Sequence, residues 1–176
     1  MNTFYMVEMD FPYPDERDSF DQFYNEHITM LLTIDGFLSA QRFACTHAAV
    51  APFLAIYQLA GPDVLSGPSY RSKAGPNSVS PTYRPRMQNW DRNLMQVADA
   101  TLDVPLGGWM VVIDRKRNTR PPLPEGYSRL QPIGLDMTVC ERGILIGSLG
   151  APTVLPETAD DWIVRLMRPL HPRRTP

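Results

Sequence analysis

Cysteine and histidine are scarce in this sequence, with two cysteines and three histidines among 176 residues. Two thiols cannot build a disulfide framework or a four-thiolate zinc site, so Cys45 and Cys140 are predicted to be reduced and buried. His27, His47 and His171 lie far apart in the chain, and no metal site is predicted from them. The sequence contains no GxGxxG, GxxxxGKS/T, HExxH or GxSxG motif, which argues against a nucleotide-binding protein and a zinc hydrolase.

The sequence also lacks an excess of charge and a long hydrophobic run. The net charge is −2 and the pI is about 5.9, so no nucleic-acid or anionic-membrane partner is predicted, and the basic residues 165–174 are interpreted as a solvated end. No apolar run approaches the roughly 18 residues that cross a bilayer. The opening residues MNTFYMVEMDF do not resemble a signal peptide, so we expect a cytoplasmic protein.

What the sequence does have is a helical pattern with a histidine in its apolar stripe. Phe20, Tyr24, His27, Leu31 and Ile34 recur every three or four residues, which predicts an amphipathic helix with His27 facing inward. The residues SFDQ at its start fit a capping box, and the following Asp-Gly pair is expected to end it. A buried imidazole is either a packed structural group or a catalytic base, and the pattern leaves both open.

Short strands and a second short helix complete the first hundred residues. A short helix is predicted to start at residue 62. Residues 66–86 are rich in Ser, Pro, Gly and Arg, which predicts a long loop that either contacts a ligand or is a mobile surface loop. The order strand, helix, strand, strand, helix, strand is that of a ferredoxin-like α+β fold, an antiparallel sheet with both helices on one face. The other face of such a sheet needs a partner. Strands are predicted at residues 3–10, 37–45 and 52–59. Residues 87–100 are expected to form a fourth strand or a strand preceded by a turn of helix, and the pattern leaves the type of this segment open.

The last third of the chain has a different composition, with ten of the eighteen prolines in residues 101–176. We predict a ferredoxin-like domain over residues 1–100, and a Pro-rich C-terminal extension or degenerate second repeat packed on it. Residues 108–114 and 140–149 predict strands, and residues 158–170 favour a strand over a helix.

The region around His27 resembles a known family. Tyr24-Asn25-Glu26-His27, followed by Leu31-Leu32, Gly36-Phe37 and Arg42-Phe43, is similar to a series found in EthD-like proteins of the dimeric α/β-barrel superfamily, although Ile28-Thr29-Met30 stands where those proteins usually carry a proline. The resemblance covers residues 3–100 and implies a homodimer whose two sheets pack face to face as a barrel, with a pocket between each sheet and its helices. Relatives include isomerases, polyketide cyclases, lyases, cofactor-free monooxygenases and haem-using enzymes, so the resemblance does not choose a reaction.

These observations together give a hypothesis for the site. His27 is the predicted general base or acid, because burial favours a neutral imidazole, and Tyr24, Arg42 and Tyr57 are predicted to hold a developing oxyanion. The predicted activity is cofactor-independent proton transfer, by a lyase, dehydratase, isomerase or cyclase, on a small apolar, aromatic or polyketide-like metabolite. The alternatives are a cofactor-free monooxygenase and a non-catalytic binding protein. No cofactor is predicted, with haem on His27 as the alternative. Substrate contacts are predicted at Phe20, Leu31, Tyr83, Arg84 and Trp90.

Overall fold

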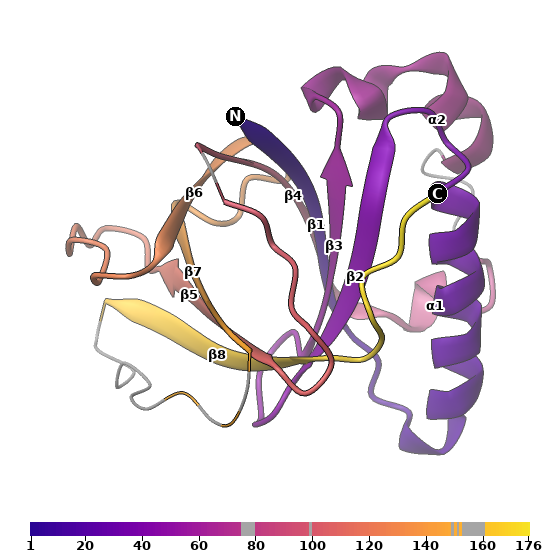
Figure 1. Cartoon of the computed structure of the whole chain (residues 1–176). Coiled ribbons are helices and arrows are strands. Elements are labelled where there is room, and N and C mark those ends of the chain that lie inside the picture. The colour runs from indigo at the N-terminus through magenta and orange to yellow at the C-terminus, as the bar shows by residue number, and fades with distance from the viewer. Residues whose placement is uncertain (75–79, 99, 149, 151, 153–160) are drawn as a thin grey trace.

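Eight antiparallel strands of one chain close into a single barrel, as the computed structural model shows for residues 1–74, 80–98, 100–148, 150, 152 and 161–176 (Figure 1). Neighbouring strands around the barrel follow the order β1-β3-β2-β8-β5-β7-β6-β4, and β4 pairs with β1 to close it. The strands are β1 Asn2–Asp10, β2 Phe37–Cys45, β3 Phe53–Leu59, β4 Gln88–Val97, β5 Trp109–Arg115, β6 Ser128–Leu135, β7 Arg142–Gly147 and β8 Trp162–Pro169.

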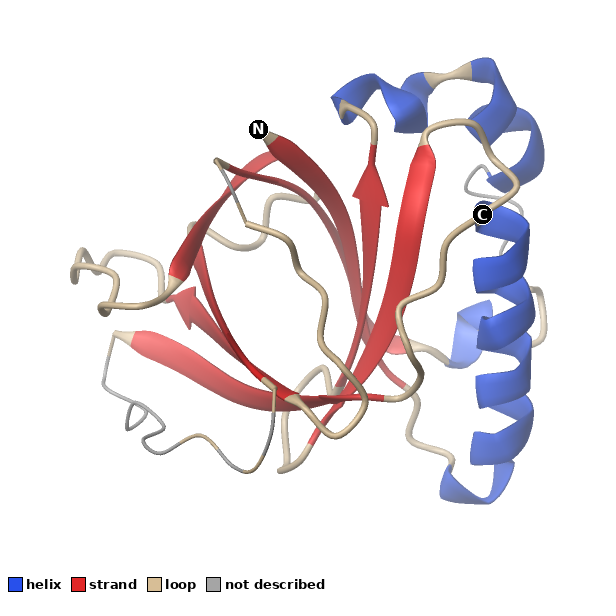
Figure 2. Cartoon of the chain, in the orientation of Figure 1, coloured by secondary structure: helices blue, strands red, loops and turns tan. Residues whose placement is uncertain are grey.

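Two α-helices, α1 Arg17–Leu31 and α2 Pro68–Ala74, lie together on one outer side of the barrel (Figure 2). The apolar stripe of α1 packs against the outward side chains of β1 and β3. The predicted capping box does not form: the helix begins before Ser19, whose hydroxyl instead donates to the carbonyl of Glu16 at 2.9 Å. Helix α2 lies in the segment predicted to be a loop. Within the described residues, no helix is long and apolar enough to cross a membrane.

The predicted ferredoxin-like α+β fold, with helices packed on one open sheet, is wrong. The chain is mostly sheet, and the barrel interior is filled from both halves of the sequence. A sheet face that would have needed a second copy is covered instead by β5 to β8 of the same chain. The homodimer was predicted because an open sheet face needs a partner, and this chain has no such open face among its described strands. Homodimerisation stays a prediction, and so does the division of the chain at residue 100.

The two halves of the barrel repeat one strand order. Read around the barrel, β4-β1-β3-β2 is followed by β8-β5-β7-β6, so each half runs fourth, first, third, second in chain order. Among the described residues, the helices lie only in the first half. No helix covers the outer face of β5 and β8 within the described residues. There the buried side chains of these two strands form a small hydrophobic cluster, and the side chains packed against it are Trp109, Leu123, Tyr127, Leu145 and Leu166.

The side chains of β1 alternate between two hydrophobic cores, one between the barrel and the helices and one inside the barrel. Tyr5 and Val7 point outward under the helices, whereas Phe4 and Met6 point into the barrel. Both faces are buried, because helices cover one side of the strand and the opposite barrel wall covers the other. The connection between β4 and β5 adds Leu102 and Val104 to the barrel interior, and Figure 1 shows it running across the barrel.

Two expectations about exposure are also wrong. Cys140 is exposed and Cys45 is only partly buried. The C-terminal residues are a docked strap and not a solvated end: Arg174 pairs with Ala40 along the edge of β2, and its guanidinium donates to the Asn25 carbonyl and to the Thr29 hydroxyl of α1. The strap occupies a part of the β2 edge that β8 does not pair, because β8 reaches only Phe43 to Cys45.

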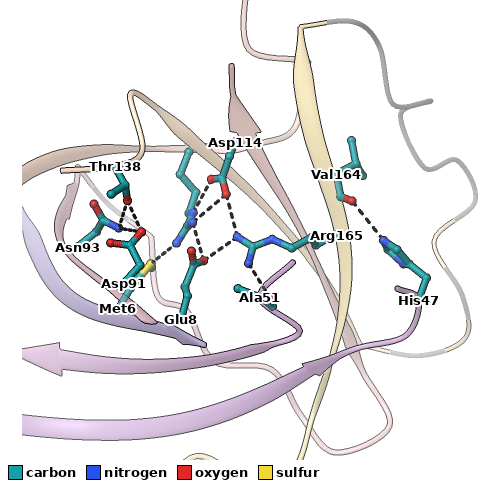
Figure 3. A network of polar contacts seen from close by, with 11 residues as sticks. Met6, Glu8, His47, Ala51, Asp91, Asn93, Asp114, Thr138, Val164 and Arg165 are labelled. Atoms are coloured by element: carbon teal, nitrogen blue, oxygen red, sulfur yellow. Dashed lines mark hydrogen bonds and ion pairs between the residues drawn. The ribbon is translucent and has the colours of Figure 1, made fainter. Parts of the chain in front are cut away.

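Four charged side chains are buried inside the barrel and join its halves (Figure 3). Arg142 on β7 donates to both carboxylate oxygens of Asp114 on β5, at 2.6 and 2.8 Å, and to Glu8 on β1 at 2.7 Å. Arg165 on β8 donates to Glu8 at 2.6 Å and to Asp114 at 2.8 Å. The two guanidinium groups keep the pKa of Asp114 below its usual value although burial opposes this.

Replacing Asp114 by asparagine is expected to lower the free energy of unfolding by about 3–5 kcal/mol, because an amide N–H would face buried guanidinium N–H groups that now donate to a carboxylate. Urea denaturation measures the change. The matched control is Asp103→Asn, since Asp103 is half exposed and 3.7 Å from Arg173, and a loss of less than about 1 kcal/mol is expected there. Equal losses in the two variants would contradict a structural role for the buried network.

Candidate active site

His27 lies between α1, α2 and the outer face of the barrel, where a small cavity of about 40 Å³ is enclosed. Four of the predicted residues besides His27 line it with this histidine: Tyr24 and Leu31 from α1, Tyr57 from β3 and Trp90 from β4. The walls are largely aromatic and aliphatic. The remaining lining residues are Tyr5, Val7, Phe23, Tyr70, Ala74, Met87 and Arg92. Of these, only Tyr70 and Ala74 lie in the segment 66–86, which the sequence suggested as a ligand-contacting loop.

Burial of His27 lowers the pKa of its imidazole from 6.5 to about 4, so the ring is neutral at pH 7. Phe23 stacks beside it, with ring centroids 6.0 Å apart, and Tyr24 meets it edge-on at 5.9 Å. No hydrogen bond to the imidazole is formed within the described residues. A neutral ring without a partner is ready to accept a proton or a hydrogen bond from a molecule in the cavity.

Four tyrosines line the same cavity, and burial keeps the phenol groups of three of them protonated. It raises the pKa of Tyr24 to about 12, and it also raises the pKa values of Tyr5 and Tyr57. The rings of Tyr5 and Tyr57 stack with their centroids 5.6 Å apart. The buried Tyr57 hydroxyl lies near enough to the Tyr24 hydroxyl for each to affect the pKa of the other, but it forms no hydrogen bond of normal geometry with any described residue. It therefore offers a neutral donor to a bound oxygen atom.

Positive charge reaches the cavity through Arg92 on β4. Its side chain forms an ion pair with Asp136 at 3.2 Å, and its backbone N–H donates to the same carboxylate at 2.9 Å. The guanidinium also lies 4.7 Å from the centre of the Trp90 ring. Arg92 was missed because it lies in a segment whose structure the sequence left uncertain. Its outward position follows from the alternation that places Asn93 inside the barrel.

Arg42, one of the predicted oxyanion-binding residues, does not line the cavity. Its guanidinium is buried behind Tyr24, 4.3 Å from the centre of that ring, and forms an ion pair with Asp21 of α1 at 2.5 Å. The geometry therefore separates Arg42 from His27 and gives it a contact that fastens α1 to β2.

Three predicted substrate contacts lie around the cavity but not in its lining. Phe20 is fully buried and stacks on Phe11 at 4.1 Å between ring centroids. Tyr83 stacks on Phe23 at 4.7 Å, and Arg84 lies 3.9 Å from the centre of the Trp90 ring. These residues support the aromatic walls from behind. Their direct contact with a substrate stays a prediction.

No group of three or more His, Cys, Asp or Glu side chains in the described part of the chain is arranged to hold a metal ion. His27 has no second ligand-forming side chain of these kinds among the residues that line its cavity. Both the prediction that no cofactor is used and the haem alternative stay predictions.

Comparison with known proteins supports the fold and leaves the reaction open. Neither the protein-family models nor the curated proteins gave a match to this sequence. A solved structure described as a "Crystal structure study of anthrone oxidase-like protein" superposes with a TM-score of 0.60 over 98% of this chain and 92% of that chain, at 10% sequence identity. The chain shares the fold of that protein over nearly the whole length of both. The finer resemblance to EthD-like proteins stays a prediction.

His27 is expected to make the protein less stable in acid. Its pKa is about 4 in the folded protein and near 6.5 when unfolded, so between these values protons bind more strongly to the unfolded chain. Stability from this residue is complete above pH 6.5 and decreases as the pH falls to about 4, by up to roughly 3 kcal/mol. Urea denaturation at several pH values should therefore show a smaller acid loss in His27→Gln than in the wild type.

The control for this experiment is His47→Gln, because His47 is exposed and lies outside the His27 cavity. That variant should lose stability in acid as the wild type does. An identical pH dependence for the wild type and His27→Gln would show that His27 is not desolvated.

Proposed function

We propose that the protein is a cofactor-independent enzyme that takes a proton from a small aromatic or polyketide-like substrate bound at the His27 cavity. The observation that carries the proposal is the placement of a neutral imidazole, unpaired within the described residues, beside buried, protonated phenols and the Arg92 cation, inside aromatic walls. These groups supply a base, hydrogen-bond donors for a developing oxyanion and a surface for an aromatic ring.

In the proposed reaction, His27 accepts a proton from an acidic hydroxyl or C–H group of the substrate. The negative charge that this leaves on a substrate oxygen is stabilised by a hydrogen bond from the Tyr57 hydroxyl, which has no partner among the described residues, and by the charge of Arg92. The pairing of Arg92 with Asp136 holds the guanidinium in place beside Trp90. Return of the proton to a different substrate atom completes an isomerisation, cyclisation or elimination.

The cavity of about 40 Å³ holds only solvent-sized molecules, so substrate entry requires its aromatic walls to separate. Tyr70 comes from α2, the shorter of the two helices, and Trp90 comes from the first residues of β4. Movement of these two side chains would enlarge the cavity while β1 and β3 remain in the barrel. Closure of the rings over the substrate would then exclude water from the reacting atoms.

A second candidate is a cofactor-free monooxygenase, and the shared fold with the anthrone oxidase-like protein favours it. Here the carbanion formed by proton transfer to His27 would react with molecular oxygen, so that a CH₂ group and O₂ give a carbonyl group and water. The two candidates use the same base. Oxygen uptake with anthrone as the probe separates them, because an isomerase or lyase consumes no oxygen.

Replacing His27 by glutamine is expected to lower turnover about 10²–10⁴-fold, since general-base catalysis contributes about that much. Tyr57→Phe removes one oxyanion donor and should lower turnover by about 10²–10³-fold with little effect on substrate affinity. Turnover is followed by the conversion of a panel of phenolic and polyketide-like compounds, together with an oxygen electrode.

His47→Gln is the matched control and should retain wild-type turnover, because His47 is exposed and outside this cavity. Circular dichroism and urea denaturation establish that each variant is folded. A folded His27→Gln variant with wild-type turnover would refute the proposed base. Ligand binding at the cavity without conversion of any compound would instead support the non-catalytic binding protein.

A further inference from the structure

A second, much larger cavity opens at one end of the barrel interior, on the opposite side of β1 and β4 from His27. Its volume is about 940 Å³, near the upper end of the range of about 300–1,000 Å³ that is usual for small-molecule sites. Ala49, Ala51, Val139, Trp162 and Ile163 form apolar parts of its wall. Polar side chains from inside the barrel, including Glu8, Asp91, Thr138 and Arg165, complete the lining. An apolar cavity with a few convergent polar groups is typical of ligand sites.

Asp91 is held in one orientation by neighbouring donors. Its Oδ2 accepts hydrogen bonds from the Asn93 amide, at 3.1 Å, and from the Thr138 hydroxyl. Figure 3 shows these three side chains gathered beside Met6. The second carboxylate oxygen, Oδ1, is buried and has no partner among the described residues, and the same is true of the Oδ1 of Asn93. Asn93 itself is fully buried. Two buried acceptors thus remain without a donor, which is costly unless a bound molecule supplies one.

The charge balance inside the barrel specifies what kind of donor would fit. Glu8 and Asp114 are neutralised by Arg142 and Arg165, whereas Asp91 forms no ion pair within the described part of the chain. Asp91 also stands directly opposite Glu8 in the pairing of β1 with β4, so a second carboxylate lies on the same inward face. Three carboxylates and two guanidinium groups leave one uncompensated negative charge, at Asp91.

We propose that the barrel-end cavity binds a small molecule with a protonated amino group and an apolar body. The ammonium group pairs with the carboxylate of Asp91, which lines the cavity, and the body lies against Trp162 and Val139. A cation is favoured over a neutral hydroxyl group because it both donates to the Asp91 carboxylate and neutralises its charge.

Three cationic residues at the edge of the cavity, Arg115, Lys116 and Arg117, do not neutralise Asp91 in place of the ligand. Arg115 is paired with Glu141 at 3.1 Å. Lys116 and Arg117 are exposed, so water and salt screen their charge from a ligand at the depth of Asp91.

The test uses three probes of similar shape and different charge: phenethylamine, 2-phenylethanol and 3-phenylpropanoate. Isothermal titration calorimetry on the whole protein at pH 7 should show that the amine binds at least about tenfold more tightly than the alcohol or the acid. Asp91→Asn should remove this preference by weakening amine binding about tenfold or more. Asp103→Asn, which changes an exposed carboxylate, should bind the amine as the wild type does.

Two further variants separate this site from the His27 cavity and from a folding defect. His27→Gln should leave amine binding unchanged. Ile163→Trp enlarges a half-exposed residue of the wall and should block the amine while it leaves the Asp91 carboxylate in place. If Asp91→Asn does not fold, Ile163→Trp decides the question. Failure of the amine to bind, equal binding of the alcohol or acid, or wild-type amine binding in folded Asp91→Asn or Ile163→Trp would each overturn the proposal.

Discussion

The pairing of charges inside the barrel is the constraint on which the rest of the structure depends. Glu8 is contributed by the first half of the chain, whereas Asp114, Arg142 and Arg165 come from the second. A buried carboxylate or guanidinium group without its partner is strongly destabilising, so the two halves must meet in one register. That register closes the barrel and places the outer face of β1 and β3 under α1. The His27 cavity exists because this outer face is held in position from inside.

The two halves of the barrel share a strand order, but helices cover the outer face of only the first half within the described residues. This difference explains why the candidate active site occurs in the first half. The first half carries α1 and α2, which enclose the cavity against the barrel. The second half covers its outer face with loop and strand side chains such as Leu123 and Tyr127. Within the described residues it therefore has no helix that could enclose a corresponding cavity.

Strands β1 and β4 serve both cavities through the alternation of their side chains. Val7 faces His27 while the next residue, Glu8, faces the barrel interior, and Arg92 and Asn93 are divided in the same way. A one-residue shift of either strand would exchange the two sets. The site proposed for proton transfer and the site proposed for an amine are thus separated by one layer of backbone, and each strand supports both with different residues.

The sequence by itself determined the elements whose periodicity is regular, because spacing along a chain is visible without the fold. It indicated α1, most of the strands, and the inward position of His27 near Tyr24 and Leu31. It missed β6, where Pro132 and alternating exposed residues weaken the strand pattern, and α2, where flanking Gly and Pro suggested a loop.

Only the tertiary structure decided the closed barrel, the ion pair of Arg42 with Asp21 and the partners of Glu8. Arg142 and Arg165 lie 134 and 157 residues from Glu8, and no local preference encodes which buried charge will meet which. Such pairs depend on the closure of the sheet, which is a property of all eight strands together.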